Sequence, residues 1–331
     1  MVANGTNFVF IAKNSFPQNK SLLKSVARLI FQLRFLIIWV FLKTIRWIRP
    51  NTKNDYQKDL EFIEWANKIC KKTISDDLHD SYLSYIEGIK GRAGVFENVI
   101  SPCWWNEAYI LEVGSGLGQN SHQIAERGAK KVVGIEYSAK KVNWSKSYFL
   151  ENKIKNLDLI QGDAENLDFP DNEFDFVFSI SVLEHVKNPK KALQEMYRVL
   201  KPGGKLLLGI DYFHAPGGNH LYDYIFFPWA TNLVSESSLC KYWSDRLQND
   251  QKKGKMGFYA SGTKIQNLGE GSEIQLNKWN SDQIEQAMIE IGWSVIKKVP
   301  SLYIGALPIF GFFKSLKFYL QGGVTYKLIK N

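Results

Sequence analysis

Apolar residues recur with two different periods between residues 108 and 210, and the alternation predicts a regular fold. Short apolar runs bounded by glycine or polar residues are typical of buried strands, and a 3.6-residue apolar period is typical of helices. The strands predicted in this way are 108–113, 131–136, 157–161, 174–179 and 205–210. The helices predicted between them are 119–127, 138–151 and 189–200, with Ser138 and Asn188 at the N-cap positions of the second and third. Repeated strand–helix units with short connections predict an α/β fold with a doubly wound, mostly parallel sheet and helices on both faces.

Residues 22–48 carry a different pattern, with apolar and basic residues on opposite halves of a helical projection. We expect an amphipathic helix that lies on an anionic membrane surface, with Trp39 and Trp47 as interface anchors and Pro50 near its end. The longest wholly apolar run, 35–42, is much shorter than the roughly 20 residues that a spanning helix needs. A spanning helix, and a helix packed on the protein or on a partner, remain alternatives.

The net charge of +9 is concentrated at the two ends of the 331-residue chain. Residues 1–53 contain nine basic residues and no acidic one, and six lysines follow Glu290, the last acidic residue. The body, residues 54–290, has 27 basic and 33 acidic residues and a net charge of −6. A protein that binds nucleic acid through a basic groove should carry its positive charge on the body, so this distribution argues against nucleic acid as the partner.

Three acidic residues stand at three successive predicted strand ends, where doubly wound sheets bind their ligands. Glu112 precedes the glycine-rich stretch 113–118, Glu136 ends the second strand, and Asp163 follows the third. The fingerprint of dinucleotide-binding proteins, G-x-G-x-x-G, has its third glycine one position later, where this chain has Gln119. The sequence therefore favours a bound pyrophosphate less. Three carboxylates suit a ligand with cationic groups.

Four motifs in this order resemble the class I S-adenosylmethionine-dependent methyltransferases. They read ILEVGSGLG (110–118), VVGIEYS (132–138), QGDAENLDFPDNEFDFVFSISVLEHV (161–186) and EMYRVLKPGGKLLL (195–208). Asp168 stands where the family commonly has proline. The resemblance implies a seven-stranded sheet with a last, antiparallel strand, and S-adenosyl-L-methionine as the cofactor. The apolar stretch 302–320 could supply that strand or contact a membrane.

The resemblance also implies a role for each residue of the cofactor site. Gly114, Ser115, Gly116 and Gly118 would form the loop under the methionine part of the cofactor. Glu112 and Ser179 would meet its amino group, the former through water. Glu136 would hold the ribose hydroxyls and Tyr137 would lie beside the adenine. Asp163 would accept a hydrogen bond from the adenine amino group, next to the Ala164 backbone. His185 of the LEHV stretch is interpreted as a structural residue.

The segment after the fifth strand, 211–280, is rich in aromatic residues and is interpreted as a lid or an acceptor-binding insertion with no clear helix of its own. His214, His220 and Asp211 are the candidates for a general base, which a hydroxyl acceptor would need. No metal site is expected, because the histidines and the three cysteines show no ligand spacing.

These patterns divide the chain into five predicted parts. They are the basic amphipathic segment 1–53, a helical cover 54–107, the cofactor-binding core 108–210, the insertion 211–280, and a C-terminal part 281–331 with a helix capped by Ser281, a strand at 293–299, a closing strand and a basic apolar tail. The small number of cysteines indicates a reducing compartment. Together with the basic amphipathic segment 1–53, this predicts a cytoplasmic protein that lies at the cytoplasmic face of a membrane.

The function expected from the sequence is methyl transfer, near the membrane surface, to an oxygen of a small-molecule, lipid-linked or glycan acceptor. A soluble small-metabolite or quinone-type methyltransferase is the alternative, and a nucleic-acid methyltransferase that uses the basic N-terminus is a weaker one. A binding protein with a degenerate site is the fourth hypothesis, and the presence of all three carboxylates argues against it. The oligomeric state is not predicted.

Overall fold

The computed structural model describes residues 37, 40–45, 56–69, 102–151, 154–212, 225, 229–252, 277–300 and 323–331. The chain forms two compact units. A sheet-containing unit is built from 82–210, 281–299 and 325–331, and a second unit from 1–81, 211–280 and 300–324.

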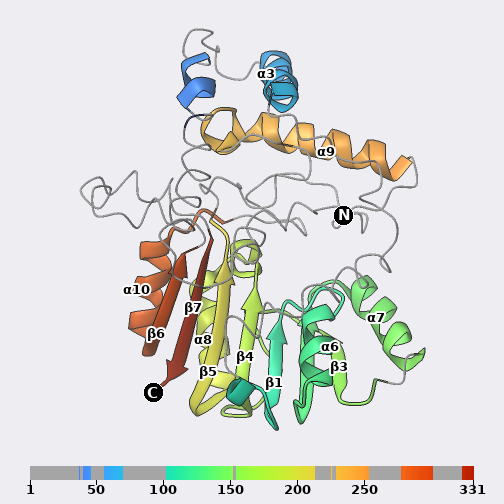
Figure 1. Cartoon of the computed structure of the whole chain (residues 1–331), viewed down its shortest axis with the longest axis vertical. Helices are drawn as coiled ribbons and strands as arrows, with labels where there is room; N and C mark the ends of the chain where they lie inside the picture. Colours follow the sequence, from blue (N-terminus) through green and yellow to red (C-terminus); the bar gives the residue numbers. More distant parts are fainter. Residues whose placement is uncertain are drawn as a thin grey trace, which may run out of the picture. The chain divides into compact units, whose positions relative to one another are not determined.

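The first unit contains a seven-stranded sheet with strand order β3-β2-β1-β4-β5-β7-β6 (Figure 1). The strands are β1 (Tyr109–Val113), β2 (Lys131–Glu136), β3 (Leu157–Gln161), β4 (Phe174–Ile180), β5 (Leu200–Ile210), β6 (Trp293–Pro300) and β7 (Val324–Lys330). The pairs β1–β2, β2–β3, β1–β4 and β4–β5 are parallel, and Figure 1 draws β7 with its arrow pointing the opposite way. The predicted α/β fold with a mostly parallel sheet is confirmed.

Apolar residues on both faces explain why the central strands form a buried sheet. In β4, Phe174, Phe176 and Phe178 are completely buried on one face, where the rings of the last two stack with their centroids 5.8 Å apart, and Val177 is completely buried on the other. Ile110 and Leu111 of β1 are equally buried. Strands that are buried on both faces need cover on both sides, which the connecting helices supply.

Those helices are α6 (Gln119–Glu126), α7 (Ala139–Glu151), α8 (Pro189–Val199) and α10 (Ser281–Ile291). The predicted cap of α8 is confirmed, because Asn188 Oδ1 accepts a hydrogen bond from the Lys191 N–H at 3.1 Å. Ser281, in contrast, is the first residue of α10, and not the cap before it.

Two sequence predictions about the strands need correction. The closing strand is Val324–Lys330. It lies beyond the stretch 302–320, which was expected to supply this strand or to contact a membrane and which is outside the described residues. The part of the tail taken as basic and apolar is therefore a sheet strand. The fifth strand begins at Leu200, because the Lys-Pro-Gly-Gly turn is an irregularity within the strand, where the partners of Phe174 and Phe176 are Leu200 and Lys205. Local periodicity cannot show a bulge that depends on the neighbouring strand.

The second unit contains two helices that pair with each other, α3 (Tyr56–Ile69) and α9 (Glu236–Lys252), and a short 3₁₀ turn, η4 (Ala230–Asn232). Buried Asp59 accepts hydrogen bonds from Ser235 Oγ at 2.8 Å and from the Ser235 N–H at 3.4 Å. Within the pair, Arg246 Nη2 lies 3.1 Å from Glu64 Oε1. The prediction that 211–280 lacks a helix is therefore wrong. The polar sequence of α9 shows no strong apolar period, and the helix is stabilised by contacts with α3.

Candidate functional site

The turn between β1 and α6 has a backbone that only glycine adopts without strain. Gly114, Gly116 and Gly118 have φ values of 76°, 59° and 77°, in the left-handed region that side chains disfavour. The backbone N–H groups of Gly114 and Ser115 both donate to the carbonyl of Ile135 in β2, at 2.9 and 2.7 Å. The turn is therefore fixed against the neighbouring strand.

The three glycines differ in what surrounds them. A Cβ atom on Gly114 would lie 2.2 Å from Val182 Cγ2, and one on Gly118 would lie 2.7 Å from Leu159 Cδ1. On Gly116 the nearest described atom would be Gln119 Oε1, at 3.8 Å. Gly114 and Gly118 are thus required by packing, whereas the missing side chain of Gly116 leaves open space of the kind a ligand can occupy.

Glu112 is buried at the end of β1 and has three hydrogen-bond donors. Asn120 Nδ2 donates to its Oε1 at 3.0 Å, and the Ser121 N–H and hydroxyl donate to its Oε2 at 3.0 and 2.5 Å. Burial raises the pKa of Glu112 to about 8, although these hydrogen bonds oppose the shift. The site therefore holds a carboxyl group that would gain from a cation nearby.

Glu136, at the end of β2, connects the glycine turn to the start of α7. Its Oε2 accepts a hydrogen bond from the Gly116 N–H at 2.9 Å, and its Oε1 accepts one from the Ser138 N–H at 3.0 Å. Lys141 Nζ lies 3.6 Å from Oε1. Each carboxylate oxygen has a second lone pair, so Glu136 keeps acceptor capacity for the hydroxyls of a ligand.

The residues after β2 and β3 form an exposed rim. Asp163 is exposed, and its Oδ1 accepts a hydrogen bond from the Glu165 N–H at 2.9 Å. Tyr137 is also exposed, Ala164 is half-buried, and Gln161 Nε2 donates to the Tyr137 carbonyl at 3.3 Å. The adjacent strand pairing of β2 and β3 brings Tyr137 and Asp163 to the same edge of the sheet.

Three buried polar atoms near the ends of β1 and β4 have no hydrogen-bond partner among the described residues. They are Ser115 Oγ, Gln119 Nε2 and Ser179 Oγ. An unsatisfied buried polar group costs about 1–3 kcal/mol, so such groups usually have water or a ligand as their partner. β1 and β4 are also adjacent at the point where the strand order reverses, which is where doubly wound sheets bind ligands. Open space, unsatisfied polar atoms and acidic groups at one edge fit a ligand that has cationic and hydroxyl groups.

Of the three candidate bases, the structure describes only Asp211, which is half-buried directly after β5. His214 and His220 lie outside the described residues. In the described ranges, no group of three histidine, cysteine, aspartate or glutamate side chains is arranged to hold a metal ion.

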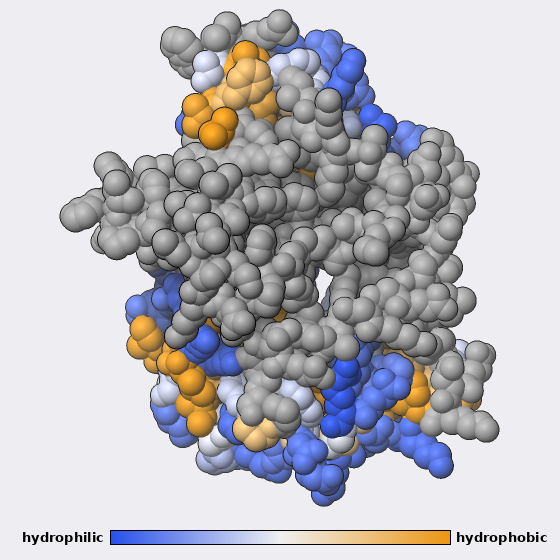
Figure 2. All heavy atoms as spheres, in the orientation of Figure 1, coloured by the Kyte–Doolittle hydropathy of each residue, from blue (hydrophilic) through white to orange (hydrophobic). Residues whose placement is uncertain are grey.

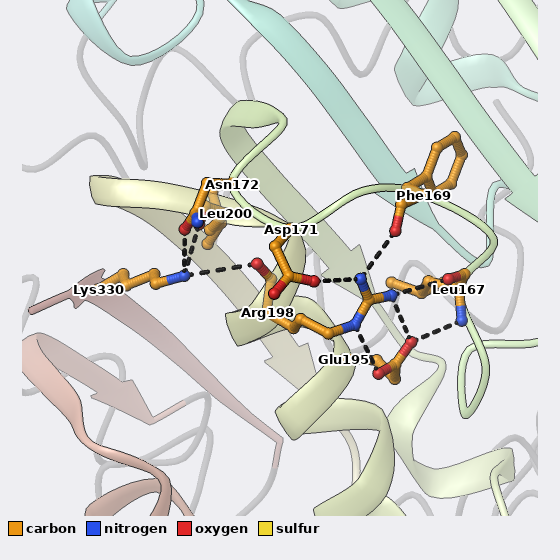
Figure 3. Close-up of polar contacts among 8 residues, drawn as sticks. All are labelled: Leu167, Phe169, Asp171, Asn172, Glu195, Arg198, Leu200 and Lys330. Carbon is orange, nitrogen blue, oxygen red and sulfur yellow. Dashed lines mark hydrogen bonds and ion pairs between the residues drawn. The ribbon is translucent and has the colours of Figure 1, made fainter.

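Sequence reasoning missed the residues that hold the connection between β3 and β4 in place. Arg198 of α8 donates to the carbonyls of Leu167 and Phe169 at 2.8 and 2.7 Å and pairs with Asp171 and Glu195, both at 2.8 Å (Figure 3). The Arg198 guanidinium lowers the pKa of the Glu195 carboxyl. The motif RVLKPGG contains this arginine, but Leu167, Phe169 and Asp171 lie 27 to 31 residues earlier, so only the fold reveals these contacts.

The strand order, the glycine turn after β1 and the acidic ends of β1, β2 and β3 define the class I fold of S-adenosylmethionine-dependent methyltransferases. Residues 111–208 match the family described as a methyltransferase domain. S-adenosylmethionine is the cofactor of this family. The site is rich in hydrogen-bond acceptors, which fit the ammonium, sulfonium and ribose groups of this cofactor.

Similar proteins include two quinone methyltransferases. The chain is 40% identical over 99 residues to demethylmenaquinone methyltransferase of Renibacterium salmoninarum, covering 30% of this chain and 39% of that protein. It is 30% identical over 152 residues to the Listeria monocytogenes enzyme of the same name, covering 43% of this chain and 60% of that protein. The chain thus spans less than two thirds of the length of these relatives.

A solved S-adenosylmethionine-dependent methyltransferase from Mesorhizobium loti aligns with a TM-score of 0.46 at 15% identity, over 73% of this chain and all of that one.

Proposed function

We propose that this protein transfers a methyl group from S-adenosylmethionine to a small molecule, with a quinone-type acceptor as the first candidate. The observation that carries the proposal is the site at the junction of β1 and β4. There a methyltransferase-family glycine turn, open space over Gly116 and three unsatisfied buried polar atoms coincide. The name of the relatives supports the acceptor class.

Each residue of the site has a part in holding the cofactor. Glu136 would accept the ribose hydroxyls, since its two oxygens each keep a free lone pair. Asp163 would accept from the adenine amino group at the exposed rim, beside Ala164 and Tyr137. Glu112, Ser115 and Ser179 would surround the methionine end.

The cofactor supplies an electrophilic methyl group on a good leaving group, so the protein contributes mainly by holding both reactants in line. An acceptor hydroxyl would also lose its proton. Asp211, His214 and His220 are the proposed bases, and the relevant comparison is the pH profile of methyl transfer for each alanine variant. A candidate whose replacement leaves the rate and profile unchanged is not the base.

Transfer of a labelled methyl group tests the proposal directly. The full chain is incubated with labelled S-adenosylmethionine and, in separate reactions, a demethylated quinone, a water-soluble phenol, a lipid-linked sugar and RNA. We expect label in the quinone, and loss of transfer in Glu136→Ala. Label found only in the phenol or only in the lipid-linked sugar would show that the acceptor is of that class and not a quinone. A chain that does not bind S-adenosylhomocysteine in calorimetry would contradict the whole proposal.

We further propose that the protein works at the cytoplasmic face of an anionic membrane, with its N-terminal segment on the bilayer surface. In the described part of this segment, Ile37, Val40 and Phe41 are 68%, 50% and 47% exposed, whereas Leu42 is completely buried. Figure 2 shows hydrophobic surface, in orange, where Figure 1 draws the short blue helix of this segment. At 100° per residue the three exposed side chains share one face, and Leu42 lies in the half that carries the basic residues. The ring of Phe41 also stacks on that of Trp65 in α3, with their centroids 6.3 Å apart, so this face is partly packed on the protein. Ile37 and Val40 remain exposed to solvent, and these two side chains support binding to a membrane surface. Among the described helices, none is long and apolar enough to cross a bilayer.

Sedimentation with anionic vesicles tests this second proposal. We expect the double variant Ile37→Ser, Val40→Ser to bind roughly tenfold more weakly, because two apolar side chains leave the interface. The matched control replaces Ile289 and Ile296, which are equally exposed but belong to the other unit, by serine. Equal loss in both double variants, or no loss in either, would contradict the assignment of the N-terminal segment as the membrane contact.

A further inference from the structure

The connection between β3 and β4, residues 162–173, is fastened to α8 at two points. Near the start of α8, Glu165 Oε1 accepts hydrogen bonds from the backbone N–H groups of Lys187 at 2.7 Å and Asn188 at 3.0 Å. Near its end, Arg198 and Glu195 hold the same connection, as Figure 3 shows. The eleven residues of α8 separate the two attachments by about 15 Å. Only the first attachment lies beside the strand ends that form the candidate site.

The backbone of Glu165 belongs to the adenine side of that site. Its N–H donates to Asp163 Oδ1 at 2.9 Å, and the Asn166 N–H donates to the Asp163 carbonyl at 3.0 Å, which closes a tight turn. Ala164 lies within this turn. The positions of Asp163 and Ala164 are therefore tied to whatever holds the Glu165 side chain.

The segment held by that side chain belongs to the methionine side. It begins at Ser179, whose buried hydroxyl has no partner among the described residues, and Ser181 follows with a positive φ of 56°. Val182 lies directly over Gly114, and the segment ends at Asn188, which caps α8. A strained backbone persists only where its surroundings hold it in place. The Ser181 N–H bond to the Gly209 carbonyl at 2.9 Å holds one end of this segment, and Glu165 holds the other.

We propose that Glu165 is a positioning residue for cofactor binding, which sets the spacing between the adenine-side turn at Asp163 and Ala164 and the methionine-side segment 179–188. This inference rests on the proposed cofactor site. Glu165 acts through the backbone of Lys187 and Asn188 and does not itself need to touch the cofactor. A ligand that bridges both sides of the site binds more tightly when their spacing is set in advance.

The test measures the affinity of the full chain for S-adenosylhomocysteine by calorimetry. We expect Glu165→Ala to weaken binding roughly tenfold, because two hydrogen bonds to a charged acceptor are lost. Glu165→Gln should stay within about threefold of the unaltered chain, because its amide oxygen still accepts from both N–H groups. Hydrogen exchange supplies the readout specific to positioning. The protection that S-adenosylhomocysteine confers on the 181–188 amides should fall in Glu165→Ala and return in Glu165→Gln.

Glu195→Ala is the matched control, since it removes an acceptor of the same kind from the distant attachment. It should lower the melting temperature and leave the affinity within about twofold, because its partners lie away from the strand ends. Equal affinities for Glu165→Ala, Glu195→Ala and the unaltered chain would overturn the role of Glu165 and leave the cofactor site intact. If the unaltered chain does not bind, the cofactor site itself is wrong. Should Glu165→Ala not fold, Glu165→Asp, which is one methylene too short, takes its place.

Discussion

Glu112 is the residue whose chemistry depends most on burial. The sequence places a carboxyl group at the end of a strand, and the fold encloses it with Asn120 and Ser121 as donors. Among the described residues none is shown as an ion-pair partner of Glu112, so burial dominates and the pKa rises to about 8.

This raised pKa predicts a pH dependence of stability. Between the ordinary pKa of 4.5 and about 8, the folded protein holds a proton at Glu112 that the unfolded chain releases. The contribution of Glu112 to the free energy of unfolding therefore falls as pH rises through this window, by up to about 1.4 kcal/mol per pH unit. Urea unfolding from pH 5 to pH 8 should show this decline in the unaltered chain and a flatter profile in Glu112→Gln. Parallel profiles in the two proteins would contradict the prediction.

Alanine at Gly116 should mainly affect ligand binding, whereas alanine at Gly118 should mainly affect packing. In Gly116→Ala the new methyl group enters open space, so we expect a stability loss of only about 1–2 kcal/mol from the positive φ. The same methyl group should lower the affinity for S-adenosylhomocysteine at least about tenfold, because it would occupy the space in which we propose that the ligand binds. Gly118→Ala should show the larger stability loss, because its Cβ would collide with Leu159 and Phe149. Thermal unfolding and calorimetry on both variants check the contrast. Unchanged affinity in Gly116→Ala would show that the space is not used.

At the scale of elements, periodicity predicted most of the sheet unit, because its strands and helices bury regular apolar faces. β2 and β3 have the bounds that the apolar runs indicated, and Asn188 caps α8 as expected. β7 was missed because Val324–Lys330 carries two lysines, and the longer apolar stretch 302–320 was considered as the source of the closing strand instead. Its Lys330 Nζ donates to the Leu200 carbonyl at 2.7 Å and to Asn172 Oδ1 at 2.8 Å, contacts that exist only after the sheet has closed (Figure 3).

The pairing of α3 with α9 gives a prediction at the same scale. The Asp59 carboxylate is buried and accepts two hydrogen bonds from Ser235, so Asp59→Ala should lower the free energy of unfolding by about 1–3 kcal/mol. Asp158→Ala is the control. Its exposed carboxylate pairs with Lys131 at 2.9 Å, and we expect a change of less than about 1 kcal/mol. Chemical denaturation measures both, and equal effects would argue against a buried role for Asp59.

At the scale of the whole molecule, the separation of charge predicts two different responses to salt. The acidic body suits a cationic cofactor that makes short-range contacts, while the proposed attraction of the basic N-terminus to a lipid surface would act at longer range. Raising the salt concentration from about 0.05 to about 0.5 M shortens the screening length to a few ångströms. Vesicle binding should then fall about tenfold or more, with the affinity for S-adenosylhomocysteine within about twofold. Vesicle binding that is insensitive to salt would contradict an electrostatic contribution from residues 1–53.

The amino-acid sequence alone determined the succession of strands and helices from β1 to β5, the glycine turn, the acidic strand ends and the cationic ends of the chain. Each of these follows from residues close together in the chain, through periodicity, backbone preference or simple charge. Only the tertiary structure decided the strand order, the closing strand β7, the pairing of α3 with α9, the raised pKa of Glu112 and the attachment of Glu165 to the start of α8. These depend on contacts between residues distant in the sequence and on the removal of water around them, which no local pattern contains.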